Sequence, residues 1–223
     1  MINENLKISI LVDNPDSWIV PYAEEIVIEL SKKNECELYF DSEDISEGDI
    51  LFLLGCTTII PKGVLRKNKH NFVVHESELP QGRGWSPVSW QVLEGRNSIP
   101  IVLFEAVEQI DAGPIYLRDS IELDGTELLP EIKRKQAEKT EELIFKLIDK
   151  WPDIKGRPQT GKGSYYRRRG IDDDRLDVNK TIAEQFNHLR IVDNKRYPAW
   201  FEYKGQEYYL KIYKKTSGPM VVK

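Results

Sequence analysis

Two short apolar runs with an amphipathic helix between them constrain the fold of this chain more than any other feature. Residues 7–13 (KISILVD) form a β-branched run that ends at Asn14-Pro15, and residues 49–54 (DILFLL) form another. Between them, apolar residues recur near helical spacing from Ser17 to Lys33. Because a helix that connects two buried strands implies parallel pairing, we expect an α/β fold with a Rossmann-like, mostly parallel sheet.

The turn after the first predicted strand contains no glycine. Residues 14–18 read NPDSW, so the chain has neither the dinucleotide-binding fingerprint nor a P-loop at this position. The sheet is therefore expected to be Rossmann-like in its layout, but without a phosphate-binding turn after its first strand.

Residues 151–163 are rich in proline and glycine and indicate a boundary between two parts of the chain. A long charged helix is expected before them, from about Glu127 to Lys150. We therefore predict a larger domain over residues 1–150, a linker over 151–163 and a small α+β subdomain over 164–223. The subdomain is expected to contain a short helix before Ile191, a β-hairpin within residues 200–212, and a frayed tail over 216–223.

Composition excludes several classes of protein. The formal net charge of −5 gives no overall attraction to nucleic acid or to an anionic membrane. No apolar run approaches the roughly 20 residues that span a bilayer, and the N-terminus lacks a signal-peptide pattern. Cys36 and Cys56 are too few for a disulfide framework or a cysteine zinc site. We expect a cytoplasmic protein with no nucleic-acid or membrane partner and no metal.

His75 and Asp111 are the leading candidates for catalytic residues. Each follows a strand-like run, and loops at the ends of buried strands are where a rigid scaffold presents reactive groups. A neutral imidazole can accept a proton near physiological pH, and a nearby carboxylate can orient it. A structural histidine and a turn-capping aspartate are the alternative, but the long loop rich in glycine and proline after His75 favours function.

The segment HESELPQGRGWSP, followed by IDAGPI, resembles the formyltransferase family that uses N10-formyltetrahydrofolate. The family pattern is Asn-x-His, a Ser-x-Leu-Pro loop with Arg-Gly, and a later Asp-x-Gly turn. The positions that match are His75, Ser77, Leu79, Pro80, Arg83, Gly84, Asp111 and Gly113. The separation of 36 positions between the histidine and the aspartate is also similar to that of the family.

The resemblance implies N10-formyltetrahydrofolate as the co-substrate and direct transfer of its formyl group, without a covalent enzyme intermediate or a metal. His75 would relay the proton of the attacking amine, and Asp111 would orient the imidazole. The segment LGCTTIIP, residues 54–61, looks like the part of the family that helps to bind folate. The implied cofactor-binding residues are Leu54, Gly55, Thr57, Ile59, Phe104, Glu105, Ile110 and Asp111.

The C-terminal third is similar to the tail of sugar N-formyltransferases, and Gly84 to Pro87 also resembles that branch. Its acceptor would be the amino group of a nucleotide-linked deoxyamino sugar, as in surface glycan biosynthesis; the pseudaminic-acid type of pathway is the closest resemblance. The implied substrate-binding residues are Ser77, Arg83, Gly84, Trp85, Arg168, Asn187, Arg190 and Tyr197.

Val73 is a departure from the family pattern, which has asparagine two positions before the histidine. Asn71 lies two residues deeper on the same face of the predicted strand and is our third candidate catalytic residue. Either Asn71 reaches the site through a local irregularity, or Ser77, a backbone N–H or an ordered water replaces the missing donor. Loss of activity is the remaining possibility.

Structural roles compete with binding for several of these residues. Arg83 either anchors its loop or contacts a diphosphate, and the run Arg167 to Arg169 is either a phosphate site or a solvated face beside three aspartates. Trp85 and Tyr197 are candidates to stack on a base or sugar, whereas Trp200 is expected in the core.

Two further functions stay open at this point. One is formylation of an aminoacyl-tRNA or another amine, which the acidic net charge disfavours. The other is a folate-binding homologue without catalytic activity, which Val73 keeps open. The exposed hairpin allows a homodimer, and a monomer with a small lid fits equally well.

Overall fold

The computed structural model describes residues 5–215 and contains one six-stranded sheet with the order β2-β1-β3-β4-β6-β7. Strands β1 to β4 pair in parallel, whereas β6 and β7 are antiparallel to their neighbours. The mostly parallel sheet predicted from the sequence is therefore confirmed. The strands are β1 Lys7–Leu11, β2 Glu35–Tyr39, β3 Gly48–Leu53, β4 Asn68–His75, β6 Ser98–Glu105 and β7 Ile115–Glu122.

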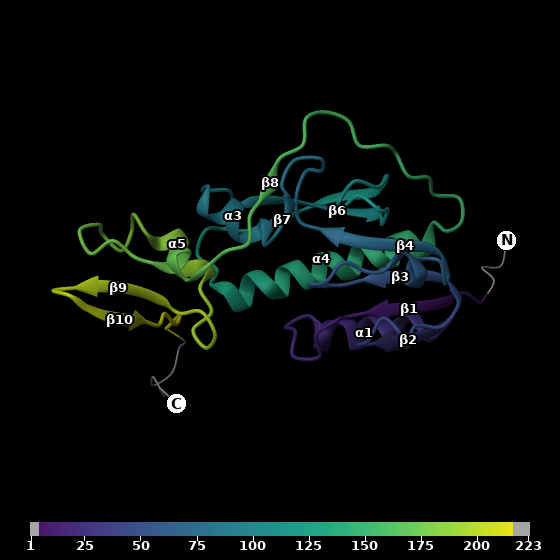
Figure 1. The fold of residues 1–223 in the computed structure, drawn as a ribbon, viewed down its shortest axis with the longest axis horizontal. Helices are drawn as coiled ribbons and strands as arrows, with labels where there is room; N and C mark the ends of the chain where they lie inside the picture. The colour runs from purple at the N-terminus through teal and green to yellow at the C-terminus, as the bar shows by residue number, and fades with distance from the viewer. Residues whose placement is uncertain (1–4, 216–223) are drawn as a thin grey trace.

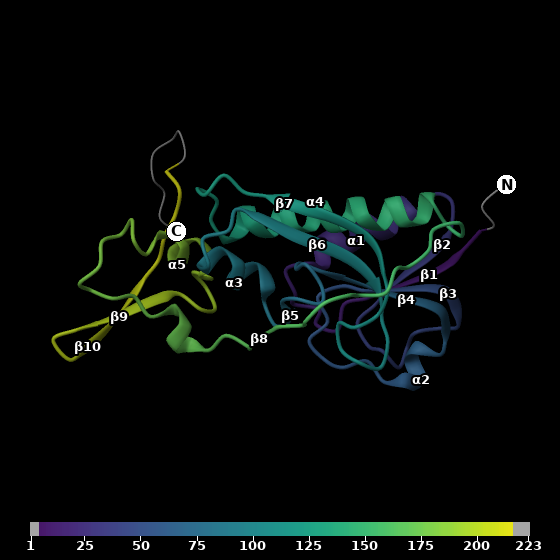
Figure 2. The same ribbon diagram turned by 90° about the horizontal axis from the view of Figure 1, so that it is seen from above.

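Helices cover the two faces of the sheet unequally (Figures 1 and 2). Helices α1 (Val20–Leu30), α3 (Pro87–Leu93) and α4 (Leu129–Asp149) pack against one face in the main apolar core. The short helix α2 (Lys62–Leu65) packs against the other face in a smaller cluster around Leu51 and Leu53. Within residues 5–215, no helix is long and apolar enough to cross a membrane.

Polar turns shorten two of the predicted helices. The N–H of Ser17 bonds to the carbonyl of Asn14, so the chain turns before α1 begins at Val20. The carboxylate of Glu127 accepts the N–H groups of Asp124 and Gly125, which places Glu127 in a turn before α4. Asn14 and Glu127 accept hydrogen bonds from backbone N–H groups outside the helices. Helical periodicity in the sequence does not reveal such turns.

The segment predicted as a linker packs along the larger part of the chain. Ile115 and Arg157 exchange two backbone hydrogen bonds, and the two-residue strands β5 (Arg83–Gly84) and β8 (Tyr165–Tyr166) pair in parallel. Residues 151–163 are therefore attached to the core in their middle, at Arg157, and directly after their end.

The C-terminal extension has a small core of its own. It contains the 3-10 helix η1 (Ile171–Asp174), helix α5 (Phe186–Ile191) and the hairpin of β9 (Ala199–Tyr203) and β10 (Gln206–Leu210). Leu176, Leu189, Val192 and Ala199 are buried together. The hairpin lies at the end of the molecule away from β1 and β2 (Figures 1 and 2). The predicted tail, residues 216–223, lies outside the described residues.

Candidate active site

A cavity of about 660 Å³ lies at the carboxyl ends of β1, β3 and β4. The chain leaves β1 toward β2 on one side, whereas β3 lies on the other, so the strand order reverses between β1 and β3. Open α/β sheets bind ligands at such a switch point, where successive loops diverge and leave a crevice. Trp18 and Ile19 after β1, and residues 54–62 after β3, line this crevice.

His75 ends strand β4 and lines the cavity. Its side chain is buried, and its Nε2 lies 2.8 Å from the carbonyl oxygen of Gly82. Because a carbonyl can only accept a hydrogen bond, this contact places a proton on Nε2. Nδ1 is therefore the ring nitrogen that remains to exchange a proton with a ligand.

Asp111 lines the same cavity from the loop between β6 and β7. Its backbone is left-handed, with φ of 51°, and its Oδ2 accepts the N–H of Gly84 at 2.9 Å. Among residues 5–215, His75 and Asp111 make these bonds to the loop of residues 82–84 and not to each other. The predicted orientation of the imidazole by Asp111 is thus indirect, because both residues hold the same loop.

Gln159 joins two loops that line the cavity, and no pattern in the sequence indicated it. Its Nε2 donates to the carbonyl oxygens of Asp111 (2.8 Å) and Gly113 (2.9 Å), and its Oε1 accepts from Nη2 of Arg83 at 2.8 Å. The predicted linker therefore connects the loop after His75 to the turn that carries Asp111. This hydrogen bond holds Arg83 within its own fold, and contact of Arg83 with a diphosphate stays a prediction.

Gly113 allows the Asp111 turn to approach the end of β6. A Cβ atom on this glycine would stand 1.7 Å from the carbonyl oxygen of Glu105. We expect Gly113→Ala to lower the free energy of unfolding by about 3 kcal/mol, the upper end of the usual cost of overpacking. Gly63→Ala is the control, because nothing lies within 4 Å of its Cβ position. Urea unfolding measures both, and equal stabilities would contradict the prediction.

Most of the predicted cofactor-binding residues line the cavity, and Glu105 does not. Its carboxylate bonds instead to Nδ1 of His70 and to the hydroxyl of Tyr116, each at 2.8 Å. Side chains alternate between the faces of a strand, so Glu105 points away from the face to which Phe104 belongs. The predicted residues that do line the cavity are Leu54, Gly55, Thr57, Ile59, Phe104, Ile110 and Asp111.

The structure places Asn71 and Ser77 outside the cavity lining. The side-chain amide of Asn71 donates to the carbonyl of Leu65 at 2.9 Å, which holds the turn between α2 and β4. Ser77 is 2 % exposed, and its hydroxyl has no hydrogen-bond partner within residues 5–215. Val73 does line the cavity. Neither Asn71 nor Ser77 therefore supplies the donor that the family asparagine would give.

The predicted substrate-binding residues divide into two groups. Gly84 and Trp85 line the cavity, and the guanidinium carbon of Arg168 lies 5.0 Å from the centre of the Trp85 ring. Asn187 and Arg190 instead belong to a buried network with Glu127 and Asn97.

Tyr197 also lies outside the cavity lining. It is 62 % exposed, and its backbone pairs with Asp193 beside the hairpin. The tail resemblance thus marked two structural residues and one exposed aromatic as ligand contacts.

Glu76, Gln136 and Thr140 line the cavity and were not predicted as site residues. Glu76 is half-buried. Burial raises the pKa of its carboxyl above the ordinary value, and the charge of Asp111 acts in the same direction. A positive charge on His75 and a hydrogen bond from Gln136 oppose this rise in pKa. The sequence showed an acidic residue beside His75, but not that both face one cavity.

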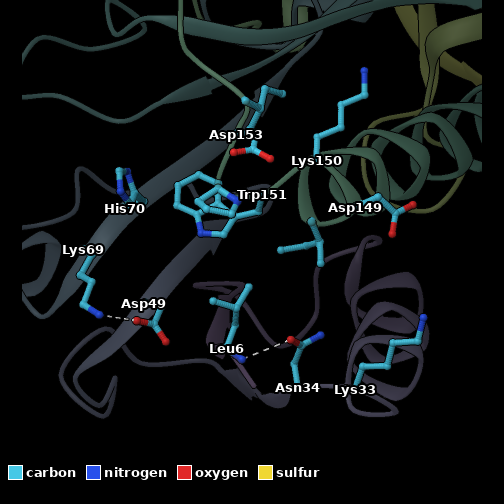
Figure 3. A pocket seen from close by; sticks show the side chains of 13 residues that line it. Leu6, Lys33, Asn34, Asp49, Lys69, His70, Asp149, Lys150, Trp151 and Asp153 are labelled. Atoms are coloured by element: carbon cyan, nitrogen blue, oxygen red, sulfur yellow. Dashed lines mark hydrogen bonds and ion pairs between the residues drawn. The ribbon is translucent and has the colours of Figure 1, made fainter. Parts of the chain in front are cut away.

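A second hollow, of about 1570 Å³, lies at the opposite, amino-terminal ends of the strands (Figure 3). Trp151 packs edge-on against His70, with ring centres 4.6 Å apart, and Lys69 pairs with Asp49 at 2.6 Å. None of the predicted site residues lines this hollow. The candidate chemistry is therefore concentrated at the carboxyl edge of the sheet.

The fold and this cavity define an α/β protein of the open-sheet class with a cavity at the topological switch point. Residues 29–148, more than half of the chain, match the formyl transferase family model. The chain belongs to the formyl transferase family.

Known proteins of two substrate classes are similar to the chain. A methionyl-tRNA formyltransferase of Thermodesulfovibrio yellowstonii is 30 % identical over 135 residues, which are 59 % of this chain and 44 % of that protein. The chain spans about half the length of the curated relatives it matches.

Solved structures share the fold at low identity. The methionyl-tRNA formyltransferase from Clostridium thermocellum has a TM-score of 0.80 at 18 % identity, covering 97 % of this chain and 96 % of that one. A sugar N-formyltransferase from a Shewanella species has a TM-score of 0.66 at 14 % identity, covering 96 % and 100 %. HypX from Aquifex aeolicus, in complex with tetrahydrofolic acid, has a TM-score of 0.79 at 17 % identity, covering 94 % and 38 %.

Proposed function

We propose that this chain is an N-formyltransferase that moves the formyl group of N10-formyltetrahydrofolate to the amino group of a nucleotide-linked deoxyamino sugar. The observation that carries the proposal is the cavity, which brings His75, Asp111 and the predicted folate-binding segment together. Family membership and the tetrahydrofolate bound by HypX support the co-substrate.

The cavity fits a flat, partly polar ligand such as the folate ring system. Its volume of about 660 Å³ lies within the usual range for small-molecule sites, roughly 300–1,000 Å³. Ile59, Phe104 and Ile110 give it apolar walls, and Asp13 orders the adjacent turn by accepting the N–H groups of Thr57 and Thr58.

His75 would act as the acid–base group of the transfer. As the acceptor amine attacks, its nitrogen becomes acidic and negative charge develops on the formyl oxygen. Nδ1 of His75 can take the proton, and the charged imidazole then stabilises the developing oxyanion. Asp111 holds the loop that anchors Nε2, and its carboxylate lines the same cavity.

Trp85 and Arg168 favour a nucleotide-linked acceptor. An aromatic face suits a nucleobase, and a guanidinium suits a diphosphate. Arg168 comes from the extension and lies over the ring of Trp85, which lines the cavity. The net charge of −5 further disfavours a tRNA acceptor.

The first experiment measures tetrahydrofolate release from N10-formyltetrahydrofolate with a panel of nucleotide-linked amino sugars, and weighs the products by mass spectrometry. Methionyl-tRNA is included because the curated relatives carry that name. A gain of one formyl group on one sugar would support the proposal, and transfer to tRNA alone would replace it. Folate binding without transfer to any amine would support the alternative that the chain is a folate-binding homologue without catalytic activity.

Trp85→Ala tests the acceptor subsite. Since stacking of a base on an aromatic ring contributes about 1–3 kcal/mol, we expect the KM for the nucleotide sugar to rise about tenfold or more, with the KM for folate unchanged. Tyr203→Ala is the matched control, because Tyr203 is an exposed hairpin ring with Lys204 over it. A KM for the sugar equal to that of the wild type would show that Trp85 does not contribute to binding the acceptor.

A further inference from the structure

Glu76 and His75 reach the reaction cavity from opposite faces of the sheet. Val73, on the same face as His75, packs with Leu51 and Leu53 on the α2 side. Val74, on the same face as Glu76, packs in the core beneath α1 and α4. The two ionisable side chains therefore flank the end of β4, and both line the cavity.

Two glutamine side chains donate hydrogen bonds to Glu76. Nε2 of Gln136 donates to Oε1 of Glu76 at 2.7 Å, and Nε2 of Gln91 donates to its backbone carbonyl at 2.6 Å. Thr140, one turn after Gln136 on α4, also lines the cavity. Helices α3 and α4 thus present uncharged groups to Glu76, and the charged partners are His75 and Asp111.

Transfer of a formyl group to an amine requires two proton losses from the acceptor nitrogen. A primary amine with a pKa on the order of 8 to 10 is mostly an ammonium ion at neutral pH. It must lose one proton before it can attack and a second after the new C–N bond forms. N10 of the folate recovers only one of them, so the other must leave through a separate acceptor.

We propose that Glu76 is a further catalytic residue of this site: its carboxylate receives the acceptor ammonium and takes its first proton, and His75 takes the second. This inference rests on the proposed function. Its basis in the structure is a half-buried carboxylate held by Gln136 in the residue next to His75, with both side chains lining one cavity.

The protons and electrons balance as follows. Glu76 accepts a proton from the ammonium and later releases it to water. The freed nitrogen lone pair forms the new bond to the formyl carbon, and the carbonyl π pair moves onto oxygen. His75 takes the second nitrogen proton and passes it to N10 as the carbonyl re-forms and the bond from the formyl carbon to N10 breaks.

The raised pKa of Glu76 suits this role, because a general base works best when its pKa lies near the working pH. The rate should fall as the pH is lowered through the pKa of Glu76, at a higher pH than an ordinary carboxyl would give. The hydrogen bond from Gln136 lowers that pKa. Its removal in Gln136→Met should therefore move the acidic limb to higher pH, whereas a purely structural Glu76 would leave the limb in place.

Glu76→Gln is the direct test, because glutamine keeps the size of the side chain and can still bond to Gln136. We expect kcat/KM for the acceptor to fall at least about 10²-fold at pH 7. The difference in kcat/KM between Glu76→Gln and the wild type should become smaller at high pH, because the amine is already neutral in solution there. The KM for folate and the Tm should stay close to those of the wild type. The control is Glu78→Gln, an exposed carboxylate of the same loop paired with Arg118.

The outcomes separate this inference from the function on which it rests. If the wild type transfers formyl groups and Glu76→Gln stays within threefold at every pH, Glu76 has no catalytic role and the proposed function stands. If the wild type transfers to no amine, the proposed function fails and the role of Glu76 fails with it. If Glu76→Gln does not fold, the pH profile of Gln136→Met decides, and an unmoved acidic limb overturns the inference.

Discussion

Replacing His75 with alanine is expected to reduce kcat for formyl transfer by about 10²–10⁴-fold, the usual contribution of general acid–base catalysis. Nε2 is committed to the carbonyl of Gly82, so Nδ1 is the only ring atom left for the reaction. Alanine removes both the proton acceptor and the charge that would stabilise the oxyanion. Single-turnover release of tetrahydrofolate measures the loss directly.

Folate binding separates a catalytic defect in this variant from a folding defect. The walls of the cavity come mainly from residues 54–62 and from the loop after β6, which His75→Ala leaves in place. Tetrahydrofolate should therefore bind His75→Ala within a few-fold of the wild-type affinity. His188→Ala, on α5, is the control for removal of an imidazole away from the cavity. Near-normal turnover by His75→Ala would show that the proposed mechanism is wrong.

Replacing Arg190 with methionine is expected to have the largest effect on stability. The guanidinium is 1 % exposed and donates to the backbone carbonyl and carboxylate of Glu127 and to the amide oxygens of Asn97 and Asn187. Breaking a buried ion pair by removing one partner costs about 3–5 kcal/mol, because the other charge stays buried. Urea unfolding of Arg190→Met should show a loss of this size.

The pH dependence of stability tests the same network. Burial acts to raise the pKa of Glu127, but hydrogen bonds from Lys135 and from the N–H of Asp124 outweigh it and lower that pKa from 4.5 to about 2. Glu127 therefore stabilises the fold above pH 4.5, and this contribution is lost as the pH falls from 4.5 toward 2.

The control for Arg190→Met is Arg175→Met, which breaks an exposed pair with Glu202 and should lower the free energy of unfolding by less than about 1 kcal/mol. Equal losses for the two arginine variants would contradict a structural role for Arg190.

The sequence predicted the parallel half of the sheet more completely than the site. Short apolar strands on either side of an amphipathic helix leave few alternatives, so β1, α1 and β3 were predictable. The antiparallel direction of β6 and β7 was not, because a turn rich in glycine and proline does not show which way the next strand runs. His75 and Asp111 were found because each follows a strand and their spacing resembles the family.

The errors at the site have particular physical causes. Glu105 was implied as a cofactor-binding residue by the family resemblance together with Phe104, although adjacent residues of a strand face opposite sides. Arg190 was implied as a ligand contact by the tail resemblance, yet each nitrogen of its buried guanidinium donates to a protein acceptor. Gln159 makes its three bonds across the fold, and nothing in its neighbouring residues indicates them.

Gln159 has a consequence for how this protein can be divided or transplanted. The match to the family ends at residue 148, before the glutamine that joins the two loops of the site and before the strand β8 that pairs with Arg83–Gly84. A fragment cut at the end of α4 would keep His75, Asp111 and the bond from Gly84 to Asp111, but it would lose the three bonds of Gln159 and the pairing with β8. The smallest unit worth grafting into another enzyme therefore extends beyond the family match, at least through Tyr166.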